Sequence, residues 1–171
     1  MAETLFYLLG ALALFCSAMI YVATRRAFWS ADRTIPRFAI TAILLGSAAT
    51  IAILASSGQQ PPPLLVGLLI AAAVARLMRD APAYRIRGGE TTELDRSAEL
   101  LTRALSGWNH LQVTLAILAG IFVPLCWFGL PQLAQALAWP AALLLVAAEI
   151  IQRALFFAAV SPPRMPGVQP A

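Results

Sequence analysis

The sequence contains no lysine, one histidine (His110) and two cysteines (Cys16 and Cys126) among its 171 residues. The two cysteines form no C-x-x-C motif, so the sequence gives no support to a zinc knuckle, a thioredoxin-like site or an iron–sulfur site. Both lie in apolar runs, where a free cysteine is most often a small buried hydrophobic side chain. A transmembrane b-type haem usually needs two histidines. We therefore expect no metal or cofactor held by this chain alone.

Charge is also scarce. Only 12% of the residues are charged and 60% are hydrophobic, whereas soluble domains average about 25% charged and about 45–50% apolar residues. A soluble domain of about 150 residues still exposes about 30% of its unfolded surface, so its core has no room for this excess. The composition excludes an ordinary soluble enzyme and predicts a protein that is solvated by lipid.

All twelve cations are arginines, against eight acidic residues, and the net charge is +4. In a soluble protein this balance would suggest a nucleic-acid partner. Here the arginines lie between long apolar runs, where they indicate membrane orientation instead. We expect no nucleic-acid partner.

No motif for catalysis is present. Gly88-Gly89 is too short for a phosphate-binding loop or a dinucleotide fingerprint. Ser106 near His110 does not make a nucleophile–histidine–acid set, and the H-E-x-x-H motif of metallopeptidases is absent.

Five apolar runs divide the chain, and about 20 apolar residues are needed to cross about 30 Å of hydrocarbon as a helix. They cover residues 4–23, 38–57, 64–78, 109–128 and 138–160. This pattern predicts an all-α, polytopic transmembrane bundle of about five helices, with residues 1–171 forming one membrane domain. Glu3 precedes the first run where a signal peptide would carry positive charge, so we expect a retained helix there.

The third run is short and has Arg76 near its end. An arginine in this position can extend its charged head to the interface while its stem stays in lipid. A run of this length is also compatible with a re-entrant or tilted segment. The sequence therefore leaves open four crossings or five.

The loops differ in charge, and this difference predicts orientation. Arginines gather in residues 24–37 and 79–107, whereas the loops around Gln59 and Gln132 contain none. We expect the two arginine-rich loops to face the cytoplasm. Five crossings place the N-terminus outside and the C-terminus inside, whereas four place the C-terminal tail outside.

The polar stretch 79–107 is expected to be a cytoplasmic loop that contains an amphipathic helix. Thr92 and Asp95 resemble a capping box, and the apolar residues that follow recur at helical spacing opposite a face that includes Glu99 and Arg103. The helix would lie on the membrane surface or pack on neighbouring loops. Residues 161–171 contain four prolines and are expected to be an irregular tail.

Small residues recur at four-residue spacing on two of the expected helices. Such stripes allow helices to approach closely in membranes. They predict close packing within the bundle along these positions: Ala42, Gly46 and Thr50, and Gly67, Ala71 and Ala75.

Glu149 lies near the middle of the fifth run, and Arg153 follows on the same helix face. A charge at the bilayer centre costs about 2.5–3.5 kcal/mol on insertion scales, so this pair is expected to face protein or trapped water. One hypothesis is a structural ion pair that holds the helix to its neighbours. The other is a group lining a quinone headgroup site or a proton path, in which Glu149 accepts a proton from a quinol hydroxyl. His110 could donate to a quinone carbonyl or simply be satisfied at the interface.

Two segments carry a family resemblance. Residues 147–157 (AAEIIQRALFF) and then 162–167 (PPRMPG) resemble the C-terminal segment of the dimethyl sulfoxide reductase membrane-anchor subunit family. Residues 16–21 (CSAMIY), followed by Thr24-Arg25-Arg26, Trp29, Phe38 and Leu45-Gly46, resemble an internal segment of the same family. Glu149 and Arg153 match the Glu-x-x-x-Arg pattern of that family.

The resemblance implies a non-catalytic anchor in the bacterial inner membrane, bound to an iron–sulfur subunit and a molybdopterin catalytic subunit. Such anchors oxidise menaquinol, pass the electrons to the iron–sulfur subunit in anaerobic respiration, and bind no haem. Typical members are longer, and their residues implicated in quinol oxidation lie outside the part that resembles this chain. We therefore expect a split, truncated or shortened anchor, with a second membrane polypeptide as a candidate source of further helices. The alternative function is a small transporter or a membrane assembly factor with no redox role.

Overall fold

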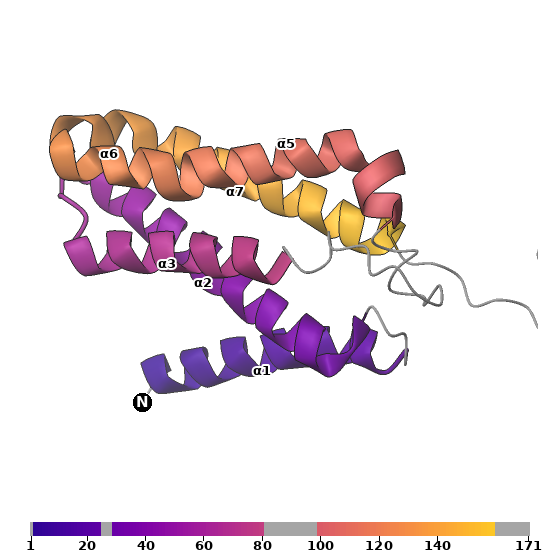
Figure 1. The fold of residues 1–171 in the computed structure, drawn as a ribbon. Coiled ribbons are helices and arrows are strands. Elements are labelled where there is room, and N and C mark those ends of the chain that lie inside the picture. The colour runs from indigo at the N-terminus through magenta and orange to yellow at the C-terminus, as the bar shows by residue number, and fades with distance from the viewer. Residues whose placement is uncertain (1, 25–28, 81–98, 160–171) are drawn as a thin grey trace, which may run out of the picture.

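The computed structural model describes residues 2–24, 29–80 and 99–159, and every structural statement below concerns these residues. All the elements that they form are helices, which confirms the all-α bundle (Figure 1). The α-helices are α1 (Ala2–Val22), α2 (Ala31–Ser56), α3 (Pro63–Asp80), α5 (Ser106–Ile117), α6 (Val123–Gly129) and α7 (Pro131–Ala158). Two π-helical turns accompany them, η3 (Leu100–Ala104) and η4 (Leu118–Phe122), and η4 joins α5 to α6 in one continuous rod.

Three segments are long and apolar enough to cross a membrane: Ala31–Ser56, Ser106–Trp127 and Ala136–Ala158. The helix α1 contributes a shorter apolar stretch, Tyr7–Val22. The helix α3 has 18 residues and carries Arg76, Arg79 and Asp80 in its last turns. The membrane character is thus borne out by length and composition, whereas the choice between four and five crossings stays a prediction.

The turn between α2 and α3 follows from its residues. Gly58 has a φ of +71°, a left-handed conformation that glycine adopts without a side-chain clash. Three prolines follow, and Pro63 is the first residue of α3, where its missing N–H costs no helical hydrogen bond. The polar break around Gln59 therefore forms a short connection between two helices.

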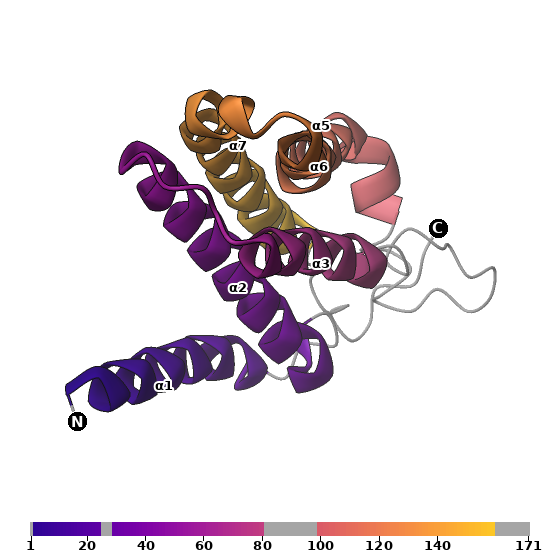
Figure 2. The same cartoon turned by 90° about the vertical axis from the view of Figure 1, so that its left-hand side faces the viewer.

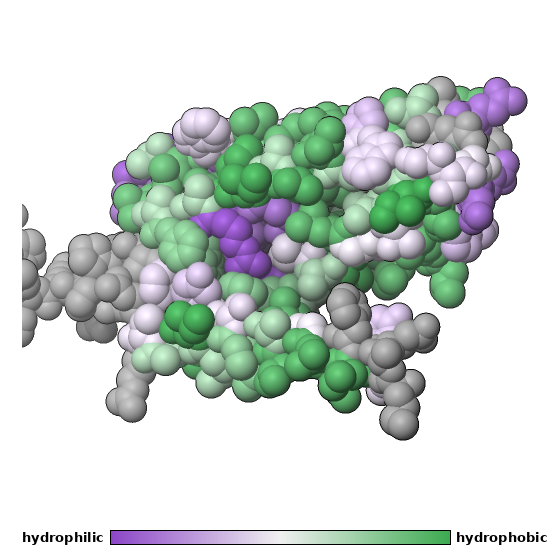
Figure 3. All heavy atoms as spheres, turned by 180° about the vertical axis from the view of Figure 1, so that it is seen from behind, coloured by the Kyte–Doolittle hydropathy of each residue, from purple (hydrophilic) through white to green (hydrophobic). Residues whose placement is uncertain are grey.

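The helix α1 stands apart from the rest of the bundle. It packs along α2 near its C-terminal end and diverges from the other helices towards its N-terminus (Figures 1 and 2). Ala18 is the only one of its described side chains that is buried, and large apolar side chains such as Leu8 and Ile20 are exposed. Much of the face that Figure 3 shows is apolar, as expected of a protein that is solvated by lipid.

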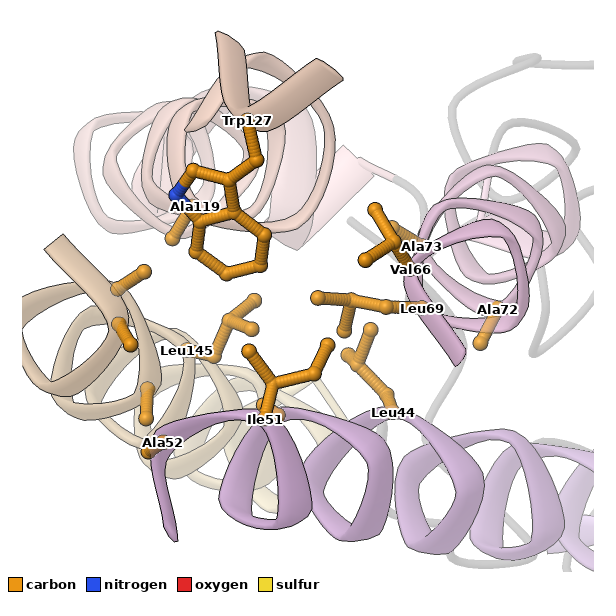
Figure 4. Close-up of a cluster of buried hydrophobic side chains, with 14 of the residues drawn as sticks. Leu44, Ile51, Ala52, Val66, Leu69, Ala72, Ala73, Ala119, Trp127 and Leu145 are labelled. Atoms are coloured by element: carbon orange, nitrogen blue, oxygen red, sulfur yellow. The ribbon is translucent and has the colours of Figure 1, made fainter. Parts of the chain in front are cut away.

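The core lies where α2, α3, η4, α6 and α7 meet (Figure 4). Leu44, Ile51, Leu69 and Leu145 are fully buried there, and the Trp127 ring lies over the same cluster. Many of the other members are alanines, whose small side chains allow the helix backbones to approach closely.

Close packing occurs, but not along the stripes that the sequence indicated. Ala42, Gly46 and Thr50 lie on the exposed face of α2. Methyl groups added at Gly46 or Gly67 would meet nothing within 4 Å, so the prediction that these glycines bring helices of this chain together is wrong. The reason is that the α2 face with the larger apolar side chains is the one that faces the core.

The close contact is instead at Gly120, in the π-helical turn η4. A methyl group at this position would lie 2.8 Å from Cβ of Ala73 on α3. Pro124, four residues later, has no N–H, and its ring would clash with the Gly120 carbonyl in a regular α-helix. The backbone widens here, and the Val123 N–H donates to the carbonyl of Leu118, five residues earlier.

The expected loop 79–107 is partly described. The helix α3 continues through Asp80, and α5 begins at Ser106, so both ends of this stretch are helical. Glu99 and Arg103, which were expected on one helix face, form an i,i+4 ion pair at 2.8 Å, although residues 100–104 adopt a π-helical turn. The capping-box residues Thr92 and Asp95, and the tail 161–171, lie outside the described residues.

Candidate functional site: a polar ladder between four helices

Every charged side chain that the structure describes lies in one half of the bundle, between the middle of α7 and one end. At that end α1, α3 and α7 end, and α2 and α5 begin (Figure 1). The connection from α2 to α3 and the one from α6 to α7 lie at the opposite end and carry no charge. The charged set consists of Asp32, Arg33, Arg37, Arg76, Arg79, Asp80, Glu99, Arg103, Glu149 and Arg153.

The deeper layer of this end is built around Glu149. Its Oε1 atom lies 2.9 Å from Nε of Arg76, and the two side chains are only 5% and 4% exposed. This contact brings opposite charges together, although the Nε–H is not aligned with Oε1 as a hydrogen bond. The Thr41 hydroxyl donates a hydrogen bond to Oε2 at 2.8 Å, whereas Oε1 has only the ion-pair contact with Arg76. Arg76 also donates through Nη2 to the Gln112 side-chain oxygen at 2.6 Å.

A second layer lies one helical turn closer to the end. Here Asp80 forms an ion pair with Arg37 and accepts a hydrogen bond from Gln152 at 3.4 Å. Arg37 is four residues before Thr41 on α2, Asp80 is four after Arg76 on α3, and Gln152 is three after Glu149 on α7. Residues at these spacings share one helix face. We call the two layers together the polar ladder.

The structure corrects the expected partner of Glu149. Arg153 is not the residue that neutralises it, because Arg76 of α3 occupies that position. The Arg153 guanidinium instead lies over the Phe38 ring, 3.8 Å from the ring centroid, in a cation–π contact. Glu149 and Arg153 still occupy one face of α7, but they have different partners.

The expectation for Arg76 is also corrected. The sequence suggested a guanidinium that extends to the interface, but Arg76 is buried. A charged partner on α7 and an amide on α5 make the interior position favourable, because a buried cation needs a counter-charge and acceptors for its N–H groups.

His110 is not part of the ladder. It lies on the exposed side of α5, whereas its neighbours Asn109 and Gln112 are buried. The Gln112 amide donates to the Asn109 side chain at 3.3 Å and so extends the deeper layer. The polar residues that α5 contributes are therefore two amides and not the imidazole.

Several buried polar atoms of the ladder and its surroundings have no hydrogen-bond partner in the described part of the chain. They include Arg76 Nη1, Gln152 Oε1 and Thr34 Oγ1. A buried donor without an acceptor costs about 1–3 kcal/mol, and more when it is charged. Arg76 Nη1 is therefore suited to an oxygen atom of a ligand or of water.

The chemistry available at the ladder is proton transfer and hydrogen bonding to an oxygen. The ladder offers two carboxylates, Glu149 and Asp80, and cationic donors that can steady an anionic oxygen. Among the described residues, no group of three or more metal-ligand side chains is close enough together to hold a metal ion.

Most of the ladder was not predicted from the sequence, which identified Glu149 but not its partners Arg76 and Thr41, nor Gln112, which accepts a hydrogen bond from Arg76. Part of the signal was present, since Arg76 and Asp80 carry opposite charges at i,i+4 next to an apolar run. The pairing itself joins residues 73 positions apart. Helical periodicity says nothing about such contacts.

We expect Thr41→Val to weaken the bundle by about 1–2 kcal/mol, because a hydrogen bond to a buried carboxylate is lost. Thermal unfolding in detergent measures this loss. Thr50→Val is the matched control, since the Thr50 hydroxyl bonds only its own helix, to the Gly46 carbonyl, on the exposed face. Equal melting temperatures for the two variants would contradict a stabilising role for the Thr41 bond.

Comparison with known proteins agrees with the resemblance in the sequence. The family model of the DMSO reductase anchor subunit (DmsC) matches residues 3–159, nearly the whole chain. No curated protein and no solved structure matches this chain. The matched range includes every described helix, apart from the first residue of α1, and every residue of the polar ladder. The chain therefore belongs to the DMSO reductase anchor subunit family: it is a membrane protein whose role is to anchor catalytic subunits.

Proposed function

We propose that this chain anchors an iron–sulfur subunit and a molybdopterin catalytic subunit at the bacterial inner membrane. The observation that carries the proposal is the family match over residues 3–159. The concentration of charge at one end supports it, because a soluble partner docks most readily where the anchor presents polar groups to water. The arginine excess of the flanking loops favours the cytoplasmic side for that end.

Menaquinol is the proposed electron donor of the assembled complex. Oxidation to menaquinone releases two electrons and two protons, and the electrons pass to the iron–sulfur subunit. Glu149 is the proposed acceptor of one hydroxyl proton, and Arg76 Nη1 is a buried donor suited to a quinol oxygen. A second membrane polypeptide that completes the quinol site belongs to this proposal.

Purification tests the anchoring role. Under mild detergent, a tagged copy of this chain should bring an iron–sulfur protein and a molybdopterin protein with it. Their metal content identifies them, and an unrelated membrane protein of similar size with the same tag is the control. Repeated recovery of the chain without either partner would overturn the proposal.

The role of Glu149 needs a variant that keeps the ladder neutral. Replacing Glu149 alone would leave Arg76 buried without a counter-charge. We therefore expect the double substitution Glu149→Gln with Arg76→Gln to assemble with its partners but to lower quinol-dependent reduction by about a hundredfold or more. The rate with an artificial electron donor to the soluble subunits should be unchanged.

The matched control is the other layer of the ladder. Asp80→Asn with Arg37→Gln removes one ion pair in the same way, and it should leave quinol-dependent reduction within a few-fold of the parent. Equal losses in the two double variants would show that Glu149 is structural. Altered uptake of a solute, with normal electron transfer, would favour a transporter.

A further inference from the structure

The polar ladder and its neighbour Arg153 do not balance in charge. Three arginines (Arg37, Arg76 and Arg153) stand against two carboxylates (Asp80 and Glu149), which leaves one positive charge. Arg37 and Arg76 form the ion pairs with these two carboxylates, whereas Arg153 forms none with a described residue and feels Glu149 only from one helical turn away, so Arg153 is the excess cation of this group. An uncompensated charge inside the membrane region is costly, and its usual remedy is an anion or water. Arg153 is therefore the position at which the described part of the bundle lacks an anion.

The depth of Arg153 indicates which surroundings it meets. The helix α7 ends at Ala158, five residues later, which is about 7.5 Å at 1.5 Å per residue. Aromatic rings surround this level, with Tyr21 in contact with Trp29, Phe38 and Phe156. Tyrosine and tryptophan are enriched where the hydrocarbon meets the headgroups. Arg153 therefore lies within reach of lipid phosphates.

The exposure of the Arg153 side chain also indicates that it can contact lipid. The side chain is half-buried, with one face of the guanidinium covered by the Phe38 ring. Ile150, Ala154 and Phe157 lie on the exposed side of α7 around Arg153, and such apolar side chains suit acyl chains.

We propose that Arg153 binds the phosphate of an anionic glycerophospholipid, whose acyl chains lie along the exposed side of α7. The guanidinium can donate two parallel N–H hydrogen bonds to phosphate oxygens, while its contact with the Phe38 ring fixes the orientation of the guanidinium plane. The lipid would supply the missing negative charge and stabilise the end of the bundle where α1, α2 and α7 meet. Lipid binding at Arg153 does not depend on quinol oxidation.

The test uses the purified full chain in a neutral detergent, titrated with phosphatidylglycerol or phosphatidylcholine. Native mass spectrometry counts bound lipid, and thermal unfolding measures stabilisation. Phosphatidylglycerol should bind and raise the melting temperature, and Arg153→Gln should weaken its binding at least tenfold. Arg33→Gln is the control, because Arg33 is an exposed arginine at the same end of the bundle. It should bind phosphatidylglycerol like the parent.

Two further measurements complete the test. One distinguishes a lipid phosphate from free inorganic phosphate as the ligand, and the other uses a conservative variant that is expected to fold. Inorganic phosphate should compete only weakly with phosphatidylglycerol, and equal affinity would show an anion site that does not select lipid. Arg153→Lys keeps the charge but loses the planar fork, so it should fold and bind with intermediate affinity. Equal binding of the two lipids, or full binding by Arg153→Gln or by Arg153→Lys, would overturn the proposal.

Discussion

Arg76→Leu is expected to destabilise the bundle by about 3–5 kcal/mol. The substitution leaves Glu149 buried, with only the Thr41 hydroxyl as a partner, and an uncompensated buried charge costs about this much. Glu149→Leu should cost a similar amount, because it leaves Arg76 in the same condition. Thermal unfolding in detergent, read from the loss of monodisperse protein, measures both effects.

The double variant Arg76→Leu with Glu149→Leu provides the decisive comparison. Replacing both members of a buried ion pair by apolar residues is often close to neutral, so most of the lost stability should return. Additive losses in the double variant would mean that the two residues act separately. The pair Glu99 and Arg103 is the control, since it is solvent-exposed and its removal should cost less than about 1 kcal/mol.

Gly120→Ala is expected to cost about 1–3 kcal/mol, although it adds only one methyl group. That methyl would lie 2.8 Å from the Ala73 Cβ, which is attached directly to the backbone of α3, so one of the two helices must shift. Gly46→Ala and Gly67→Ala are matched controls, because their methyl groups would meet nothing within 4 Å. These two variants should unfold at or slightly above the parent temperature, since alanine favours helix over glycine.

A compensating substitution tests the cause. Adding Ala73→Gly to Gly120→Ala removes the atom that the new methyl group meets, so part of the lost stability should return. The recovery will be incomplete, because glycine within α3 itself costs about 1 kcal/mol. If Ala73→Gly lowers the stability of Gly120→Ala further, the contact between η4 and α3 is not the source of the loss.

Sequence and structure agree closely on the helices. Apolar runs of 15 to 23 residues predicted α1, α2, α3, the rod α5–η4–α6 and α7, because lipid tolerates only backbone that satisfies its own hydrogen bonds. The prediction of close packing at Gly46 and Gly67 was wrong, since spacing reveals a stripe but not the direction in which it faces. The close contact between helices is instead at Gly120, within a π-helical turn for which Pro124 was the only signal in the sequence.

The sequence by itself determined that the protein is a helical membrane protein whose arginines gather in two of its loops, and the family resemblance indicated an anchor subunit. Composition and charge placement carry the first of these conclusions locally, residue by residue along the chain. Only the tertiary structure decided that Glu149 forms its ion pair with Arg76 and not with Arg153. It also decided that the Arg153 guanidinium lies over the Phe38 ring. The physical reason is that a buried charge pairs with an opposite charge that lies close to it in space, and the packing of the helices determines which side chains lie that close.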